Sequence, residues 1–272
     1  MKKIDTHIHF APEIPHFTEL AQASRHEYTA SHLAGVFAEL DIVHAVVMGN
    51  RGLRPGSFDD YPAFLSYCAG LHKENLEPDV LPESIALAEE NLRSPRCVGL
   101  KIYAGYCPLN LNDPIYFPFY ELAATYQKPV AVHTGTTAHP RAFQKYSHPL
   151  QLDDVAVLYP QVQFVMCHFG NPWLMDAAAV LEKNENVVAD LSGLLVGYLD
   201  MPVFTQEQAG YIQQLKTWIA YVDDYDKFMY GTDWPLANMR NYIDFITMLI
   251  PERHLENVFY NNAARVYAPR VK

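Results

Sequence analysis

Short apolar runs alternate with segments of helical periodicity along the whole chain, and this alternation constrains the fold more than any other feature. Apolar residues at helical spacing mark the intervening segments 31–40, 83–92, 115–126, 152–159, 174–183, 206–221, 242–250 and 255–267. Eight runs have the length and composition of strands: 4–10, 45–48, 64–71, 98–103, 130–134, 164–168, 187–191 and 228–232. Fully apolar strands are typical of a parallel sheet that is covered on both faces.

Eight strand-helix units of about 34 residues each predict an α/β protein, a parallel (β/α)8 TIM barrel built as a single domain over residues 1–272. Half of the residues are apolar, and no linker-like Ser/Gly run divides the chain. The alternative is an open doubly wound sheet, which here lacks a Gly-rich phosphate loop after the first strand. Residues 51–62 show no helical pattern between the second and third strands, and residues 11–26, which prolines interrupt, are expected to be irregular.

Net charge and cysteine usage limit the possible partners and the cellular compartment of the protein. The formal net charge of −11 argues against nucleic acid or an anionic membrane as a partner, but it leaves the substrate open. No apolar run resembles a signal-peptide core or reaches the length of a membrane span. The four cysteines, Cys68, Cys97, Cys107 and Cys167, form no C-x-x-C pair and are expected to be buried thiols. We therefore expect a cytoplasmic protein.

The first strand carries two histidines that are separated by one residue. Strand alternation predicts that Asp5, His7 and His9 share one face, while Ile4 and Ile8 line the other. Two imidazoles at this spacing can both reach one divalent metal ion through their ring nitrogens. The competing interpretation is a chance His-x-His near a polar terminus.

Polar residues recur at the ends of later strands. Lys101, His133, His168, Asp190 and Asp233 all lie in or directly after apolar runs. Active sites of barrels are built at the carboxyl ends of the strands, so we expect these side chains to meet there. The competing interpretation makes the histidines hydrogen-bonded core residues and Asp233 the cap of a following helix.

The chain resembles the amidohydrolase superfamily, specifically the amidohydrolase 2 branch, which also contains aminocarboxymuconate-semialdehyde decarboxylase and related aromatic-acid decarboxylases. The resemblance runs from residue 4 to about residue 267 and is specific for fold and metal site, not for substrate. The motifs that carry it are 5–9 (DTHIH), 99–101 (GLK), 133–135 (HTG), 168–173 (HFGNPW), 190–193 (DLSG), 231–235 (GTDWP) and 261–265 (NNAAR).

The resemblance implies one divalent metal ion held by His7, His9 and His133 as neutral imidazoles and by Asp233. Such a nitrogen and oxygen set suits Zn²⁺, with Mn²⁺, Fe²⁺, Co²⁺ or Ni²⁺ as alternatives. An open coordination position would take a water, whose pKa a metal can lower to about 7. Asp233 would then be the general base, and His168 would polarise a substrate carbonyl or shuttle a proton.

The surrounding polar residues would support the metal ligands or contact the substrate. Asp5 is expected to orient the metal ligands, and Asp190 either lies below the site or bonds a neighbouring strand end. In two-metal relatives a carbamylated lysine bridges the ions, and Lys101 occupies that place. One metal is the expected arrangement here, with Lys101 as a substrate contact or an ion-pair partner.

Loop residues after the strands would supply specificity. Arg51 is the predicted carboxylate clamp because a guanidinium can bind two oxygens in parallel. Tyr103 is predicted to contact substrate together with Lys101. Further candidates for the pocket wall are Tyr106, His72, His139, Arg141 and Trp234.

Three functions are compatible with these residues. The first is a metal-dependent hydrolase that attacks the carbonyl of a small lactone, ester or amide, one that bears a carboxylate, with metal-activated water. The second is a metal-dependent non-oxidative decarboxylase of a small unsaturated or aromatic acid. The third is a barrel that binds metal without turnover. The resemblance also implies a homodimer.

Overall fold

Eight parallel strands form the barrel that the sequence predicts. The computed structural model describes residues 1–54 and 56–268. The strands are β1 (Lys3–Ile8), β2 (Ile42–Met48), β3 (Leu65–Leu71), β4 (Cys97–Ile102), β5 (Val130–Val132), β6 (Phe164–Met166), β7 (Val187–Asp190) and β8 (Phe228–Met229). Each strand pairs with the next in parallel, in the order β1 to β8. The predicted fold class is therefore confirmed.

The barrel closes where β8 meets β1. The backbone N–H of Thr6 donates to the carbonyl oxygen of Tyr230 at 3.0 Å. Just beyond, Ile8 and Trp234 form a parallel bridge. These contacts bring the first and last strand ends together, so residues more than two hundred positions apart share one end of the barrel.

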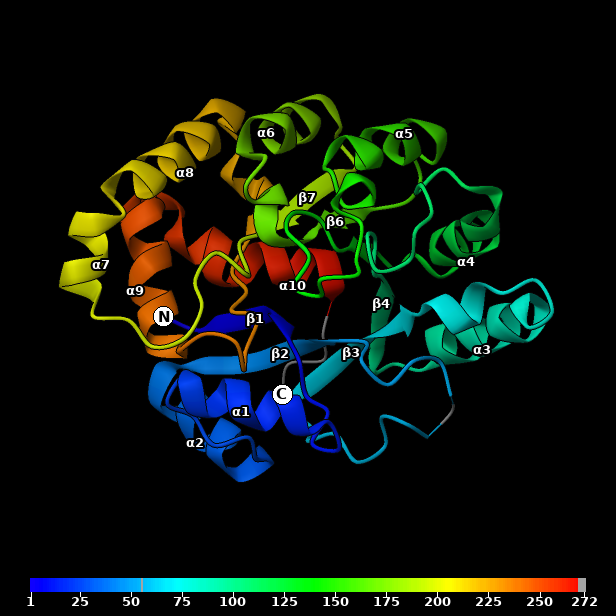
Figure 1. Ribbon diagram of the computed structural model, residues 1–272, viewed down its shortest axis with the longest axis horizontal. Helices are drawn as coiled ribbons and strands as arrows, with labels where there is room; N and C mark the ends of the chain where they lie inside the picture. The colour runs from blue at the N-terminus through cyan, green and yellow to red at the C-terminus, as the bar shows by residue number, and fades with distance from the viewer. Residues whose placement is uncertain (55, 269–272) are drawn as a thin grey trace.

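Helices pack around the barrel, and most of them lie between consecutive strands (Figure 1). They are α1 (Pro15–Ala23), α2 (Ala30–Leu40), α3 (Leu81–Arg93), α4 (Phe117–Tyr126), α5 (Leu150–Leu158), α6 (Leu174–Lys183), α7 (Met201–Glu207), α8 (Ala209–Val222), α9 (Met239–Leu249) and α10 (Asn262–Tyr267). Within residues 1–54 and 56–268 we find no helix that is long and apolar enough to cross a membrane.

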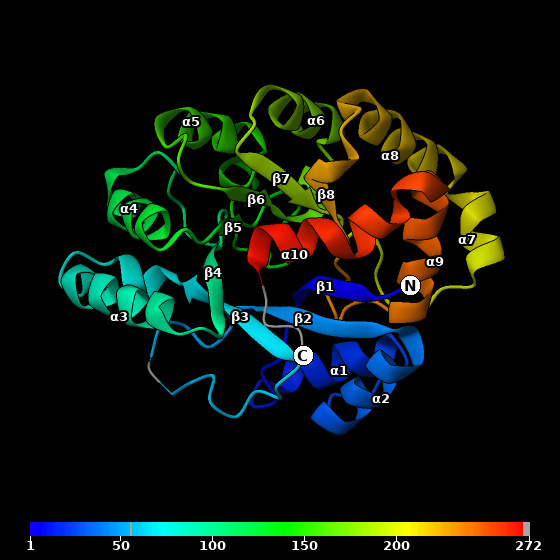
Figure 2. The ribbon, with the colours of Figure 1, turned by 180° about the vertical axis from the view of Figure 1, so that it is seen from behind.

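Two layers of apolar side chains fill the molecule because strand residues alternate between the faces of the sheet. In β2, Ala45 and Val47 pack outward against the helices. Val46 and Met48 point inward and join an inner cluster with residues of all the other strands. Figure 2 shows α10 lying across one end of the barrel, and its residues Ala263 and Tyr267 belong to this inner cluster.

The four cysteines are free and buried, as predicted from their spacing. Cys68 and Cys167 belong to the inner cluster, whereas Cys97 and Cys107 pack in the outer layer. Full burial of an apolar side chain contributes about 1.5–3 kcal/mol, so both layers are major sources of stability.

Several predicted boundaries are wrong. Residues 15–23 form helix α1 within the segment that was expected to be irregular, because Pro15 stands in the first turn, where a helix tolerates proline. The predicted helix 206–221 is two helices, α7 and α8, which meet at Gln208. The last predicted helix, 255–267, is a π-helical segment from Asn257 to Asn261 followed by α10.

Other boundaries agree with the sequence. Between β2 and β3, the described residues 49–54 and 56–64 contain turns and bends but no helix, in agreement with the missing helical pattern. Position 55 of that loop and positions 269–272 of the predicted domain lie outside the described residues.

Candidate metal centre

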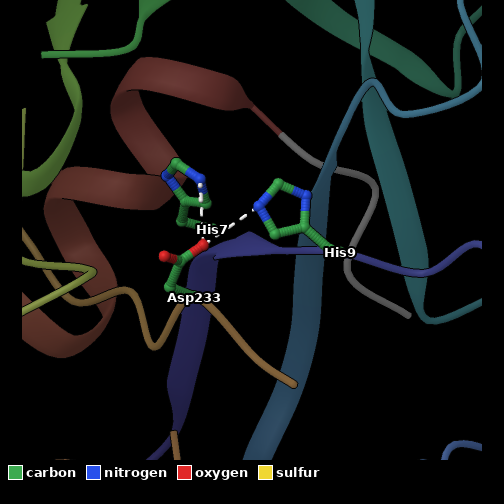
Figure 3. Close-up of side chains that lie close together, drawn as sticks. All are labelled: His7, His9 and Asp233. Atoms are coloured by element: carbon green, nitrogen blue, oxygen red, sulfur yellow. Dashed lines mark ion pairs between the residues drawn. The ribbon is translucent and has the colours of Figure 1, made fainter. Parts of the chain in front are cut away.

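Three side chains from the two ends of the chain converge at the mouth of the barrel. The Nε2 atoms of His7 and His9 lie 3.5 Å and 3.0 Å from the same oxygen, Oδ1 of Asp233. One ligand atom from each residue lies within 4.8 Å of the others. Figure 3 shows the two imidazoles and the carboxylate facing one another.

The backbone brings these residues together through an irregular β1. The register of β1 against β2 shifts between Asp5 and Ile8. As a result, Ile4 belongs to the inner cluster and Ile8 to the outer one, so the expected strict alternation is wrong. The shift is the physical reason, because an extra residue on one strand turns the following side chains to the other face.

Asp233 lies four residues beyond the end of β8 and adopts a left-handed backbone conformation with φ of 60°. Its N–H donates to the carbonyl oxygen of His7 at 2.8 Å. The carboxylate is thereby directed at the imidazoles and does not cap a helix.

Asp5 ties the same two chain segments together from below. Its carboxylate accepts hydrogen bonds from the Thr232 hydroxyl at 2.6 Å and from the Thr232 N–H at 3.0 Å. It also accepts the backbone N–H of His7, not a ring nitrogen. Burial raises the pKa of Asp5 to about 7, in spite of the hydrogen bonds from Thr232. Asp5 therefore holds the backbone that carries the histidines and leaves the imidazoles to other partners.

Those partners are Asp190 and Asn50. His7 Nδ1 lies 2.9 Å from Asp190 Oδ2, and His9 Nδ1 lies 2.6 Å from Asn50 Oδ1. Both oxygens are acceptors, so each Nδ1 carries the proton and each Nε2 presents a lone pair. The sequence pattern leaves two roles open for Asp190 and does not indicate a role for Asn50, although Asn50 follows the second strand directly.

His133 and His168 lie beside this cluster but outside it. His133 is not among the three residues whose ligand atoms share the 4.8 Å sphere. Its Nδ1 lies 3.1 Å from Nε2 of His168, and the His168 ring centroid lies 4.8 Å from that of His7. Both side chains line the same cavity as His7 and His9.

The sequence predicted that His168 ends a strand, and this prediction is wrong. β6 stops at Met166, and His168 lies in the following turn with φ of 64°. A left-handed residue cannot continue a parallel ladder, which explains the earlier end of the strand.

Burial sets the protonation states of these groups. Desolvation lowers the pKa of His7 to about 4. It also lowers the pKa of His168, and it lowers the pKa of His133 well below the usual value for histidine. Burial alone would raise the pKa of Asp233, but the close approach of His9 and the other histidines of the site holds it well below its usual range. Neutral imidazoles and an ionised carboxylate are the forms that bind metal.

A divalent cation fits this arrangement. Asp233 Oδ1 and His133 Nε2 are both buried, and neither has a hydrogen-bond partner among residues 1–54 and 56–268. Buried polar atoms without partners are rare and call for an explanation such as an ion. The donor set, imidazole nitrogens with one carboxylate oxygen, suits Zn²⁺ and the neighbouring first-row metals.

A cavity of about 630 Å³ opens above the three converging side chains. Lys101 and Tyr103, the predicted substrate contacts, line it, together with His72, Tyr106 and Phe17. The Lys101 ammonium is buried, lies 2.9 Å from the Cys167 thiol and faces the Tyr103 ring at 5.5 Å. No carboxylate of the described residues lies within ion-pair distance of Lys101, so its ammonium can donate to an anionic oxygen of a ligand.

Arg51 is not placed as the sequence suggested. It is absent from the described residues that line this cavity. Its guanidinium instead binds Glu13 Oε1 at 2.8 Å and Asp60 Oδ1 at 2.6 Å. A guanidinium occupied by two carboxylates of its own chain is not free to clamp a substrate carboxylate.

Some of the other predicted wall residues line the cavity and others do not. His72 and Tyr106 line the cavity, but Trp234 is fully buried against aromatic residues, and His139 and Arg141 are outside the described lining. Helix α1 contributes Phe17, whose ring stacks on that of His9 with centroids 5.5 Å apart. Sequence reasoning missed Phe17 because it assigned that segment to an irregular loop.

Comparisons with known proteins agree with the barrel fold. A search of curated protein sequences finds no match. The chain is similar in structure to 2,6-dihydroxybenzoate decarboxylase in complex with 2,6-dihydroxybenzoate, with 16% identity, a TM-score of 0.71 and coverage of 98% of this chain and 99% of that one. It is also similar to a probable 2-pyrone-4,6-dicarboxylic acid hydrolase from Acinetobacter baumannii, with 17% identity, a TM-score of 0.63 and coverage of 98% and 100%.

A third similar structure is a dihydroxybenzoic acid decarboxylase from Polaromonas with bound manganese and the inhibitor 2-nitroresorcinol. Identity is 15%, the TM-score is 0.68, and coverage is 98% of this chain and 97% of that one. Identities this low establish the shared barrel alone. The family model described as amidohydrolase, however, matches residues 4–268, which is nearly the whole chain. The chain therefore belongs to the amidohydrolase family.

Proposed function

We propose that the protein is a metal-dependent hydrolase that cleaves a lactone, ester or amide bond in a small, carboxylate-bearing compound. The observation that carries this proposal is the position of Asp233 Oδ1, which is buried, lacks a hydrogen-bond partner among the described residues, and faces Nε2 of both His7 and His9. The amidohydrolase family is metal-dependent, and a similar structure contains manganese.

His7, His9 and Asp233 would hold the ion, with His133 completing the set through Nε2. A bound divalent ion would supply Lewis-acid chemistry, polarising a carbonyl group and making water more acidic. Zn²⁺ is our proposed metal, with Mn²⁺, Fe²⁺, Co²⁺ and Ni²⁺ as alternatives. We propose one ion, because Lys101, the residue that would bridge a pair, contacts the Cys167 thiol.

Asp233 is the carboxylate of the cluster formed with His7 and His9, so we propose that it accepts the proton of the attacking water. The predicted catalytic role of His168 is less direct. Both of its ring nitrogens already have partners, Ser192 Oγ at 2.8 Å and His133 Nδ1 at 3.1 Å. Contact with a substrate carbonyl would require one of these bonds to break.

Lys101 and Tyr103 would bind the substrate. The Lys101 ammonium would donate to the carboxylate of the substrate, because an unpaired buried charge is costly and an anion in the cavity would relieve that cost. Tyr103 stacks on His72 with centroids 5.2 Å apart and presents an aromatic wall to the cavity. A small planar molecule fits between these groups.

The second candidate is a non-oxidative decarboxylase of an unsaturated or aromatic acid. The same buried ammonium and aromatic wall favour it, because they would hold a planar acid with its carboxylate inside the barrel. Two of the similar structures reported above are decarboxylases.

One experiment separates the two reactions. The purified protein is loaded with Zn²⁺ or Mn²⁺ and offered lactones, esters and amides, and in parallel aromatic and unsaturated acids. Hydrolysis in ¹⁸O-labelled water places the label in the new carboxylate of the product, whereas decarboxylation releases carbon dioxide and leaves a product with one carboxylate fewer. Asp233→Asn is the control and should abolish either signal. A metal-loaded protein that turns over neither class would favour a barrel that binds metal without catalysis.

A further inference from the structure

A chain of hydrogen bonds runs from β7 to His133 through three side chains. The Ser192 hydroxyl contacts Asp190 Oδ1 on one side and His168 Nδ1, at 2.8 Å, on the other. His168 Nε2 then lies 3.1 Å from His133 Nδ1. Ser192 is fully buried, and all four side chains are more than nine-tenths buried.

The number of protons on these side chains determines which group donates and which accepts in each of these hydrogen bonds. Asp190 Oδ1 already accepts the backbone N–H groups of His168, at 2.9 Å, and of Ser192, at 3.1 Å, so it is an acceptor toward the Ser192 hydroxyl as well. The single Ser192 proton therefore goes to Asp190, and the Ser192 oxygen accepts from His168 Nδ1–H. A neutral His168 then has a bare Nε2, which accepts from His133 Nδ1–H. The proton of a neutral His133 is thus on Nδ1, and its Nε2 carries a lone pair.

The backbone is shaped to maintain this chain. His168 N–H donates to the same Asp190 oxygen at 2.9 Å, so its backbone and its ring are held by one segment. Gly193 follows Ser192 with φ of +63°, and a Cβ at this position would lie 2.5 Å from His168 Nδ1. Only glycine allows the ring to lie this close to the segment that fixes it.

Asp190 and Asn50 fix the tautomers of His7 and His9 by direct contact with Nδ1. The tautomer of His133 is fixed in the same sense, but through two intervening side chains. In all three imidazoles Nδ1 carries the proton and Nε2 is free. His133 Nε2 is also one of the buried nitrogens without a partner among residues 1–54 and 56–268. Three separate sets of hydrogen-bond partners therefore give the same imidazole tautomer.

We propose that Ser192 is a positioning residue whose hydroxyl, acting through His168, holds His133 in the tautomer that can bind a divalent metal ion. The proposal rests on the metal site of the proposed function but not on the reaction catalysed there. It assigns His168 a role in orienting His133 and Asp190 a role in fixing both His7 and His133.

Tautomers can be read directly in the metal-free protein. Long-range ¹H–¹⁵N spectra of histidine-labelled protein distinguish Nδ1–H from Nε2–H imidazole, and His133→Gln and His168→Gln assign the two signals. We expect both residues as Nδ1–H tautomers. A His133 signal of the Nε2–H form in the wild-type protein would overturn the proposal.

Ser192→Ala tests the consequence for metal binding. Without the hydroxyl, His168 can place its proton on Nε2 and donate to His133 Nδ1, which forces the His133 proton onto Nε2. Affinity for Zn²⁺, measured by competition with a chelator, should fall by about 10- to 100-fold, the usual range for partners of metal ligands. An affinity within twofold of the wild type would overturn the proposal.

Ser66→Ala is the matched control. Ser66 is also buried inside the barrel and also bonds a histidine, with its Oγ 2.7 Å from His44 Nε2, but it is outside the described cavity lining. It should leave Zn²⁺ affinity unchanged. If Ser192→Ala weakens Zn²⁺ binding while no substrate is turned over by the wild type, the positioning role stands and the proposed hydrolase activity fails.

Discussion

The two ends of the barrel interior differ in chemistry although the same eight strands build both. At the end formed by the carboxyl termini of the strands, inward side chains are ionisable, with Lys101, His133 and Asp190 among them. At the opposite end, Ile4 and Val98 pack with α10 in an apolar cluster. Hydrophobic burial stabilises that end, whereas burial at the first end carries a desolvation cost.

This cost is met by specific partners. Among the described residues of the polar end, most buried side-chain nitrogens and oxygens have a hydrogen bond, and the exceptions include Asp233 Oδ1 and His133 Nε2. The polar end should therefore govern metal binding and activity with little effect on folding, and the apolar end should do the reverse. Four experiments test this division.

Asp233→Asn should have the largest effect. The substitution keeps the shape of the side chain but removes the charge that faces His7 and His9. Metal affinity and turnover should each fall by at least about 100-fold, since even partners of metal ligands contribute 10- to 100-fold. Metal content after dialysis and steady-state kinetics measure these effects.

The stability of the metal-free Asp233→Asn protein should change little, because loss of a buried charge offsets loss of the electrostatic contact with His9. Unfolding of the protein in the presence of a chelator provides this measurement. A variant that unfolds much more readily, yet still binds metal when folded, would contradict the division of the barrel into two ends.

Ile4→Ala is the converse change at the apolar end. Ile4 is fully buried in the inner cluster, so a cavity there should lower the free energy of unfolding by about 2–5 kcal/mol. Denaturant titration measures this value, and Zn²⁺ affinity of the folded variant should equal that of the wild type.

Val157→Ala is the surface control for Ile4→Ala, because Val157 is 58% exposed on α5. This control should change the free energy of unfolding by less than about 0.5 kcal/mol. A loss of metal affinity in Ile4→Ala as large as its loss of stability would show that the two ends are coupled.

His44 should make the apolar end sensitive to acid. Burial, together with the charge of Arg96, lowers the pKa of His44 to about 4, against 6.5 for an unperturbed histidine. Between these values the unfolded chain binds the proton more tightly, so the contribution of neutral His44 is complete above about pH 6.5 and is lost as the pH falls toward 4. The full difference corresponds to about 3 kcal/mol.

The measurement is the free energy of unfolding at pH 7 and at pH 4.5 for the wild type and for His44→Gln, which retains a partner for Ser66 but does not titrate. The wild type should lose more stability than the variant on acidification. Equal losses in both proteins would mean that His44 does not contribute to acid sensitivity.

The sequence predicted the architecture well because that information is local and repeated. Eight apolar runs of strand length recur at similar intervals, and each strand-helix unit can pack in only one way in a barrel. Errors fell where local rules conflict. Pro15 was taken to interrupt structure but begins α1, and the register shift in β1 overrides alternation between Ile4 and Ile8.

The candidate site was predicted only as far as strand ends could be recognised. His7, His9 and Asp233 come together because each follows or ends a strand at the same face of the barrel. The roles of Asn50 and Ser192 could not be predicted, since no pattern in one sequence states which nitrogen of which imidazole they contact. The partners of Arg51 were missed for the same reason, because Glu13 and Asp60 lie in loops without periodicity.

Arg51→Ala should have the smallest effect on substrate binding, and Lys101→Met is the variant for comparison. Arg51 is bound to two largely exposed carboxylates, at 52% and 66% exposure, and ion pairs of this kind contribute about 0–1 kcal/mol. We expect the KM for a carboxylate substrate to stay within about threefold in Arg51→Ala. Lys101→Met should raise it at least about tenfold, because Lys101 faces the cavity without a carboxylate partner among the described residues. A large rise in KM for Arg51→Ala alone would mean that Arg51 exchanges Glu13 and Asp60 for the substrate, and that the binding surface extends beyond the barrel mouth into the loop after β2.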